Sequence, residues 1–261
     1  MRSRSRRWVG SLIVILVLIG LFQIATSWKP VADALGIRPF LLASPTEIAG
    51  SLRDDRSQLA DAAATTLVEV IAGFALALIS GVALALLVHR FETARRAIYP
   101  LLIGSQAIPV IAIAPILIVW FGFGLGPKLA IIALVCFFPI TVNTMDGLRR
   151  TDPQKMELLR SLGASRSQLL VWLEAPSALP YLMSGAKVAA AIAVIAAVFA
   201  EWSGSNEGLG YLIQSSSAQL LTARMFAAIL VLSLIGLAMF WAIGAIERKL
   251  VFWDSDDGVD R

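Results

Sequence analysis

The sequence predicts an all-α integral membrane protein with six transmembrane helices, and three observations point to it. Of the 261 residues, 58% are hydrophobic and 15% are charged, with a mean hydropathy of +0.79. An average soluble domain has about 45–50% apolar and about 25% charged residues. The apolar residues gather in blocks near the 20 or so that a spanning helix needs. Positive charges also concentrate in alternate segments between these blocks. These features argue against a water-soluble domain and exclude a disordered chain.

The six apolar blocks define the predicted spans. The first follows an arginine-rich start and could also be a cleaved secretory signal. It is long for a signal core and has no clear small-x-small cleavage site, so we expect an uncleaved helix. The blocks cover approximately residues 9–25, 63–88, 98–120, 129–145, 180–199 and 225–245.

The distribution of positive charge predicts the orientation. Cytoplasmic loops carry an excess of Lys and Arg. With the N-terminus inside, fifteen of the 22 Lys and Arg residues fall in cytoplasmic segments, six fall outside, and Lys187 lies within the fifth span. Both termini are therefore expected in the cytoplasm. The inside residues are Arg2, Arg4, Arg6, Arg7, Arg90, Arg95, Arg96, Arg149, Arg150, Lys155, Arg160, Arg166, Arg248, Lys249 and Arg261.

This topology gives the predicted organisation. It comprises a cytoplasmic N-terminus (1–8), a first transmembrane helix (9–27), an external segment (28–62), a five-helix core (63–247) with a cytoplasmic loop (147–179), and a cytoplasmic tail (248–261). Ser44-Pro-Thr-Glu47 is typical of a helix start in the external segment.

Small residues recur every four positions in two spans. Such stripes let helices approach closely in lipid. We expect packing inside the bundle, with a dimer face or the translocation path as alternatives. The stripes are Gly73, Ala77, Gly81 and Ala85 in the second span and Gly185, Ala189, Ala193 and Ala197 in the fifth.

The loop at 147–179 carries the clearest local signal. Thr151 with Gln154, or Asp152 followed by Pro153, would begin a short helix at about 153–162. Gly163 suits the left-handed position that ends a helix, and Ser165 with Gln168 would start the next. Pro176 and Pro180 would then disturb that second helix. The first helix offers an apolar face of Met156, Leu159 and Leu162. That face could pack on its own chain or dock into a soluble partner.

The same loop resembles a known family motif. The run Glu157-Leu-Leu-Arg-Ser-Leu-Gly163, nine residues, then Leu173-Glu-Ala-Pro176 is similar to the EAA motif of permease subunits of bacterial ATP-binding-cassette (ABC) importers with the type I fold. Leu158 and Leu159 replace the motif's two alanines but keep its apolar character. Further segments resemble the branch that handles aliphatic sulfonates, taurine, nitrate and the hydroxymethylpyrimidine precursor of thiamine. Among these are Gln106-Ala-Ile-Pro109, Phe138-Pro-Ile-Thr-Val-Asn143 and the run from Ala200 to Tyr211, whose Glu201-Trp202 pair leans towards the pyrimidine members.

The resemblance implies a type I importer permease whose loop holds a cytoplasmic coupling helix. Gly163 would form the turn and Glu157 would brace the loop or meet the ATPase. It also implies two ATPase subunits, a second permease as a homodimer, an external substrate-binding protein and the bacterial inner membrane. The chain itself would be a transport subunit without enzymatic activity or cofactor, with ATP and Mg²⁺ on the partner ATPase and no nucleic-acid partner. The coupling residues would be Met156, Glu157, Leu159, Leu162, Gly163 and Pro176.

Polar residues inside the spans are candidates for the substrate path, since charge is costly at membrane depth. We expect Glu69 and Lys187 to reach the interface and Gln106 and Asn143 to form hydrogen bonds between helices. Glu201 would be an external gate, a receptor contact or a wetted helix end. The substrate-path candidates are Gln106, Asn143, Lys187 and Glu201.

Two rival functions are weaker. An ion-coupled secondary transporter would need midplane ionisable residues and usually an internal repeat, and neither is evident in the sequence. A membrane-embedded enzyme would rest on the lone His89 without a catalytic motif. One Cys and one His exclude a disulfide framework and argue against a metal cluster. The sequence also has no GxxxxGK[ST] phosphate-binding loop, so ATP would be hydrolysed on another chain.

Overall fold

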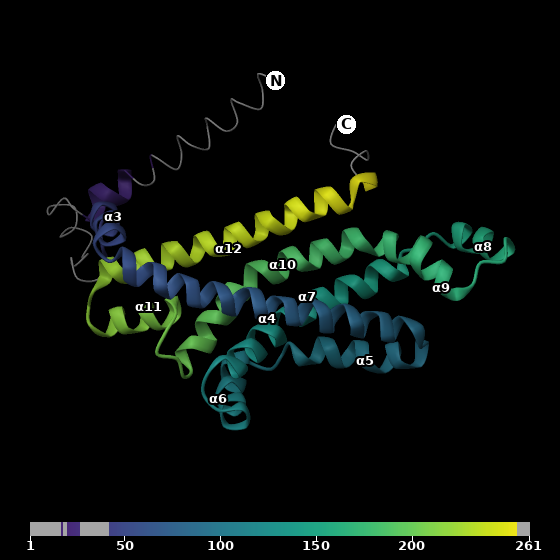
Figure 1. Cartoon of the computed structure of the whole chain (residues 1–261), viewed down its shortest axis with the longest axis horizontal. Coiled ribbons are helices and arrows are strands. Elements are labelled where there is room, and N and C mark those ends of the chain that lie inside the picture. The colour runs from purple at the N-terminus through teal and green to yellow at the C-terminus, as the bar shows by residue number, and fades with distance from the viewer. Residues whose placement is uncertain (1–16, 18–19, 27–41, 255–261) are drawn as a thin grey trace, which may run out of the picture. The chain divides into compact units, whose positions relative to one another are not determined.

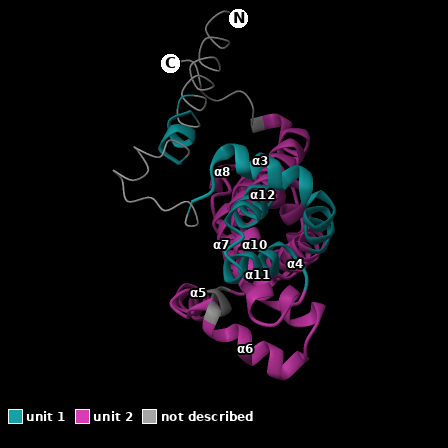
Figure 2. Cartoon of the chain, turned by 90° about the vertical axis from the view of Figure 1, so that its left-hand side faces the viewer, with its two compact units in different colours: residues 1–65, 207–232 teal, residues 66–206, 233–261 magenta. Residues whose placement is uncertain are grey.

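The computed structural model describes residues 17, 20–26 and 42–254, and all regular structure in this part of the chain is helical (Figure 1). The predicted first span at 9–27 lies largely outside the described residues, as do residues 28–41 and most of the tail. Two compact units are distinguished in Figure 2, residues 1–65 with 207–232 and residues 66–206 with 233–261. We call them unit 1 and unit 2.

Unit 1 contains α3 (Pro45–Asp54), the start of α4 (Arg56–Arg90), α11 (Leu209–Ala218) and the start of α12 (Thr222–Leu250). The predicted helix start is confirmed. The Ser44 side chain accepts from the Glu47 amide, and the Glu47 carboxylate accepts from the Ser44 amide, which completes a capping box.

Unit 2 contains the rest of the chain that the structure describes. Its elements are α5 (Glu92–Ser105), α6 (Val110–Phe121), α7 (Leu125–Arg149), α8 (Pro153–Ser161), α9 (Arg166–Leu169), the π-helix η1 (Leu170–Glu174), α10 (Ala175–Trp202), the remainder of α4 and α12, and the 3₁₀-helix η2 (Phe252–Asp254).

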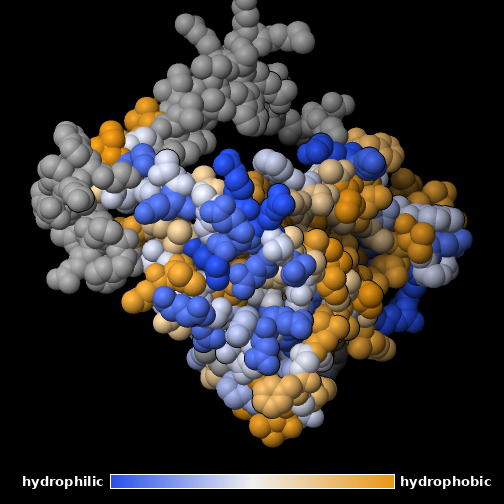
Figure 3. Space-filling view, turned by 60° about the vertical axis from the view of Figure 1, so that its left-hand side comes forward, coloured by the Kyte–Doolittle hydropathy of each residue, from blue (hydrophilic) through white to orange (hydrophobic). Residues whose placement is uncertain are grey.

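Four helical segments are long and apolar enough to cross a membrane. They are Arg56–Arg90, Leu125–Arg149, Arg166–Trp202 and Thr222–Leu250, and they coincide with the predicted second, fourth, fifth and sixth spans. Large apolar side chains remain exposed along α4, as expected of a lipid-facing surface, and the face in Figure 3 carries broad apolar areas beside polar ones. These side chains include Leu67, Val68, Ile71, Leu76, Ile79 and Leu87.

The predicted third span at 98–120 is divided in the structure. The chain forms α5 and α6 there, separated at residues 106–109. Pro109 caps α6, and a proline disfavours helical geometry in the residue before it. Pro115 and Pro139 lie inside α6 and α7 and interrupt neither helix.

The fifth span begins earlier than predicted. Residues 166–202 form one helical segment, and the π-turn of η1 directly precedes Pro176 in the first turn of α10. A proline ring clashes with the carbonyl four residues earlier in a regular α-helix. A π-turn widens the backbone at that point. The regular α-helix is therefore disturbed before Pro176 as predicted, while the chain stays helical and continues into α10.

The small-residue stripes pack inside unit 2, as predicted. A Cβ built on Gly73 would lie 2.6 Å from Ile132 Cβ, and one on Gly185 would lie 2.6 Å from the Pro139 carbonyl oxygen. The Cys136 thiol donates to the Ala189 carbonyl at 3.4 Å. Both stripes therefore face α7, and close backbone approach accounts for their small residues.

Candidate functional site

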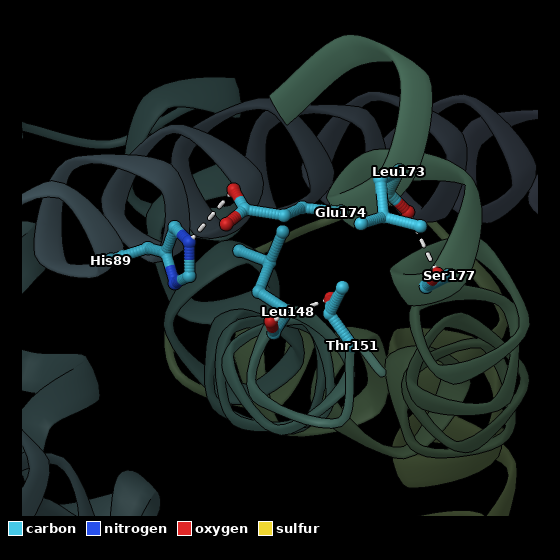
Figure 4. Close-up of polar contacts among 6 residues, drawn as sticks. All are labelled: His89, Leu148, Thr151, Leu173, Glu174 and Ser177. Carbon is cyan, nitrogen blue, oxygen red and sulfur yellow. Dashed lines mark hydrogen bonds and ion pairs between the residues drawn. The ribbon is translucent and has the colours of Figure 1, made fainter. Parts of the chain in front are cut away.

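The first short helix of the loop at 147–179 begins as its sequence predicts. The Asp152 carboxylate accepts from the Gln154 amide at 2.9 Å, and Pro153 occupies the first turn of α8. Thr151 is not the cap, because its hydroxyl is buried and donates to the Leu148 carbonyl at 3.1 Å (Figure 4). Of the two predicted caps, Asp152-Pro153 is confirmed.

The end of α8 is fixed by two backbone hydrogen bonds around Gly163. The Ala164 amide donates to the Leu159 carbonyl at 3.0 Å, and the Gly163 amide donates to the Arg160 carbonyl at 2.9 Å. This is the Schellman arrangement, which needs a left-handed residue after the helix. Gly163 has φ +86°, so the predicted turn is confirmed.

The next helix also starts from its predicted cap. The Ser165 hydroxyl accepts from the Gln168 amide, and the Gln168 side chain accepts from the Ser165 amide at 2.7 Å. The two caps enclose a turn of only a few residues. Local hydrogen bonds therefore satisfy backbone groups at both ends of α8 and at the start of α9.

The apolar face of α8 is divided between the chain and the surface. Met156 and Leu159 are half-buried, whereas Leu162 is 74% exposed and Leu158 is 60% exposed. Glu157 is exposed and forms no ion pair within the described residues. Part of the face is therefore covered by the chain itself, and docking into a partner stays a prediction. Leu158, which was not predicted to belong to this face, is exposed apolar surface next to Leu162.

The loop is tied to the helical bundle at Glu174. Its carboxylate lies 3.0 Å from His89 Nε2 in the last turn of α4, as Figure 4 shows. One turn later, the Ser177 hydroxyl donates to the Leu173 carbonyl at 2.7 Å. The half-buried Pro176 stands between them, in the first turn of α10. The second half of the motif thus joins α4 to the start of α10.

A buried polar cluster lies at the other end of the same helices. Lys128 Nζ donates to Glu69 Oε1 at 2.6 Å, and the Thr66 hydroxyl donates to Glu201 Oε1 at 2.6 Å. Glu69 is 2% exposed and Glu201 is fully buried. Two buried contacts therefore hold α4 to the start of α7 and to the end of α10. We refer to Thr66, Glu69, Lys128 and Glu201 as the buried cluster.

This cluster corrects the prediction for Glu69 and removes one alternative for Glu201. Glu69 does not reach an interface and Glu201 is not a wetted helix end, since both are buried inside unit 2 together with Lys128. Charges at membrane depth usually pair with one another. The sequence offered one indication of the buried cluster, namely charges of opposite sign in or beside apolar stretches. It did not indicate which of these residues would pair.

The remaining path candidates lie apart from the cluster. Lys187 pairs with Glu247 of α12. The Asn143 side-chain amide donates to the Pro139 carbonyl at 2.7 Å. This bond lies within α7, whereas a bond between helices was expected. Gln106 is exposed at the break after α5. Lys187 and Glu201 stand about 21 Å apart along α10 at 1.5 Å per residue. The structure therefore does not bring the four candidates together.

The sequence is similar to those of known proteins over most of its length. It is 42% identical over 227 residues to the formylaminopyrimidine transport permease protein ThiX of Halalkalibacterium halodurans, covering 87% of this chain and 90% of that one. It is 36% identical to the riboflavin transport system permease protein RibX of Chloroflexus aurantiacus, covering 91% and 89%. It is 27% identical to the taurine transport system permease protein TauC of Escherichia coli, covering 98% and 95%.

The fold is similar to that of solved transporter subunits. A chain of the MetNI methionine ABC transporter in an inward-facing conformation aligns with a TM-score of 0.65 at 18% identity, covering 76% of this chain and 98% of that one. A chain of an amino acid ABC transporter aligns with a TM-score of 0.59 at 13% identity. Residues 73–252 match the family described as binding-protein-dependent transport system inner membrane component. The chain therefore belongs to this family and is a membrane permease subunit of an ABC importer.

Proposed function

We propose that this permease imports a small pyrimidine related to thiamine precursors. The observation that carries the proposal is the 42% identity over 87% of the chain with a permease named for formylaminopyrimidine transport. The taurine relative is 27% identical. A relative from Bacillus subtilis, named for aliphatic sulfonates, is 34% identical over only 57% of the chain. The Glu201-Trp202 pair favours the same choice.

The loop at 147–179 supplies the coupling to ATP hydrolysis in this proposal. Its helix α8 is held by caps at both ends and presents Glu157, Leu158 and Leu162 outward. Met156 and Leu159 are half-buried, Gly163 forms the turn that ends α8, and Pro176 lies in the first turn of α10. The loop is joined to α4 by the His89–Glu174 contact and continues into α10. It can therefore transmit a rigid-body movement, provided that ATP binds one state better than the other.

The assembly contains two copies of this chain, two ATPase subunits and an external substrate-binding protein. ATP and Mg²⁺ bind the ATPase, and this chain needs no cofactor. It lies in the bacterial plasma membrane with six spans and both termini in the cytoplasm. The broken pair α5 and α6 makes the third crossing, because irregular backbone is tolerated where it faces protein or a water-filled cavity. The fifteen-to-six charge asymmetry supports this orientation.

The substrate path is the least constrained part of the proposal. Gln106 lies exposed at the break between α5 and α6, and Asn143 lies where α7 meets Gly185 of α10. We propose these two as path residues. Lys187 and Glu201 would act through their partners Glu247 and Thr66, by holding the helices that border the path.

The test is uptake in proteoliposomes containing this chain, its ATPase and its binding protein. We expect ATP-dependent accumulation of radiolabelled formylaminopyrimidine or hydroxymethylpyrimidine, with taurine, an alkanesulfonate and riboflavin as competing substrates. Selective accumulation of one of those three would refute the pyrimidine assignment. Accumulation driven by an ion gradient with this chain alone would refute the ATP-driven mechanism as well.

A further inference from the structure

A cavity of about 420 Å³ lies beside the loop at the end of α4. Its polar wall comes from three different helices, with Arg90 on α4, Arg160 on α8 and Arg166 on α9. We call it the arginine cavity. It is also lined by Leu86, His89, Leu169, Leu170 and Glu174.

The three arginines carry uncompensated positive charge. None of their guanidinium groups forms an ion pair or hydrogen bond with another described residue. Glu174 is the one carboxylate in the lining, and it is already in contact with His89. Three guanidinium groups therefore face one carboxylate. Guanidinium groups bind phosphate through paired N–H donors, so the cavity suits a phosphate-bearing anion.

The apolar wall indicates that this anion has a hydrocarbon part. Leu86 and Leu170 are partly exposed and line the cavity together with the buried Leu169. The neighbouring Leu87 on α4 is 58% exposed. His89 and Arg90 form the last turn of α4, where the apolar stretch ends. In a bilayer whose hydrocarbon core ends with the apolar stretch of α4, the arginine donors would lie level with the lipid phosphates and the leucines level with the first acyl carbons.

We propose that the arginine cavity binds the phosphate group of an anionic phospholipid from the cytoplasmic leaflet. Basic pockets between transmembrane helices on this side of a membrane are typical sites for such headgroups. Arg160 precedes Gly163 and Arg166 follows it, so a bound phosphate joins α8 and α9 to the end of α4. This role rests on the coupling function proposed for the loop, and lipid binding itself does not.

The direct test is lipid retention by the purified full chain. The chain is exchanged into nanodiscs containing phosphatidylcholine with increasing phosphatidylglycerol, and the retained phosphatidylglycerol is measured by native mass spectrometry after release. We expect at least a tenfold loss of retention in the double variant Arg90→Gln/Arg166→Gln. Arg248→Gln/Lys249→Gln is the matched control, because it removes two charges from the last turn of α12 and should retain the lipid.

A second double variant keeps the test decisive if the glutamine variant does not fold. Arg90→Lys/Arg166→Lys preserves charge but removes the paired donors, and we expect intermediate retention. Equal retention in wild type and both cavity variants would overturn the proposal. So would an equal loss in the α12 control, because the effect would then be general surface charge.

Two further arms separate the sources of the anion. Inorganic phosphate or glycerol 3-phosphate that displaces phosphatidylglycerol at micromolar concentration would assign the cavity to a free anion and overturn the lipid assignment. Release of the lipid when the ATPase is added would assign the arginines to ATPase docking and also overturn it. Retention does not depend on transport, so failed pyrimidine uptake with intact retention would refute only the proposed function.

Discussion

The two ends of α4, α7 and α10 hold the helices together by different means. At one end, the loop at 147–179 is fixed by caps between residues close in sequence, and much of its polar surface is exposed. At the other, the buried cluster joins residues far apart in the chain. Glu69 and His89 are separated by about 30 Å along α4, which is about the thickness of the hydrocarbon core of a bilayer.

This difference predicts how each end responds to substitution. A cap residue affects one turn of backbone, and its loss is worth about 0.5–2 kcal/mol. A buried charge that loses its partner costs several times more, because no water replaces the lost contact. The loop should therefore tolerate changes that preserve its backbone, while the buried cluster should tolerate almost none. The variants below test this contrast in order of expected effect on stability.

The largest effect is expected for Lys128→Met. It leaves the Glu69 carboxylate buried without its ammonium partner, which costs about 3–5 kcal/mol in comparable buried pairs. The measurement is thermal unfolding of the detergent-purified chain. Lys155→Met, which removes an exposed lysine from α8, is the matched control and should change stability by less than about 0.5 kcal/mol.

The double variant Glu69→Gln/Lys128→Met identifies the cause of this loss. Removing both charges should recover part of the stability, because an isolated buried charge no longer remains. A single Lys128→Met variant as stable as wild type would show that the pair does not hold α4 to α7.

An intermediate effect is expected for Gly185→Ala, in the packing that connects the two ends. The added Cβ would lie 2.6 Å from the Pro139 carbonyl oxygen and 2.8 Å from Asn143 Cβ. Overpacking of this kind costs about 1–3 kcal/mol. Gly104→Ala in α5 is the control, because its Cβ meets nothing within 4 Å, and it should leave stability unchanged or raise it slightly. Equal unfolding temperatures would contradict close packing of α10 on α7.

A smaller loss of stability but a complete loss of coupling is expected for Gly163→Val. A Cβ at Gly163 meets nothing within 4 Å, so the cost comes from φ +86° alone. A non-glycine residue pays about 1–2 kcal/mol in that region. We expect normal membrane insertion but no co-purification with the ATPase, or ATP hydrolysis uncoupled from uptake.

Gly163→Asn is the matched variant, since asparagine tolerates the left-handed region better. It should retain most of the coupling. Glu157→Lys tests the exposed face without altering the backbone, and we expect it to impair coupling too. Normal coupled uptake by both Gly163→Val and Glu157→Lys would exclude α8 as the coupling helix.

The contrast also explains what the sequence could predict. The bounds of α8, the turn at Gly163 and the start of α3 follow from cap residues within a few positions of one another, and all three are confirmed. Helix caps satisfy groups of their own turn, so a local pattern is sufficient to identify them. The four long apolar helices follow from composition in the same way.

The buried cluster and the α5–α6 break depend on information that is not local. Glu69 and Lys128 are identifiable as charges in apolar surroundings, but their pairing depends on how α4 packs against α7. Asn143 was expected to bond another helix and instead bonds the Pro139 carbonyl within α7. Pro109 interrupts its helix, whereas Pro115 and Pro139 do not. The outcome at each proline depends on packing that no local pattern specifies.

The smallest effect is expected for the partly exposed pair of Asp55 and Arg224 in unit 1. Arg224 Nη2 donates to Asp55 Oδ1 at 2.6 Å, and this bond holds the pKa of the Asp55 carboxyl below its ordinary value. A lowered pKa stabilises the folded chain above the unfolded value of about 3.9, and the contribution disappears as the pH falls through the folded pKa. Solvent limits such a pair to less than about 1 kcal/mol.

The measurement is the unfolding midpoint of wild type and Asp55→Asn between pH 7 and pH 3. At pH 7 the variant should be slightly less stable than wild type, and the difference should shrink as the pH falls below the unfolded pKa and through the lowered folded pKa, where the Asp55 carboxylate takes up a proton. A difference as large as that of Lys128→Met would show that exposure does not separate the two pairs. A small difference that disappears at low pH would show that access to water determines how much each of the two ion pairs contributes to stability.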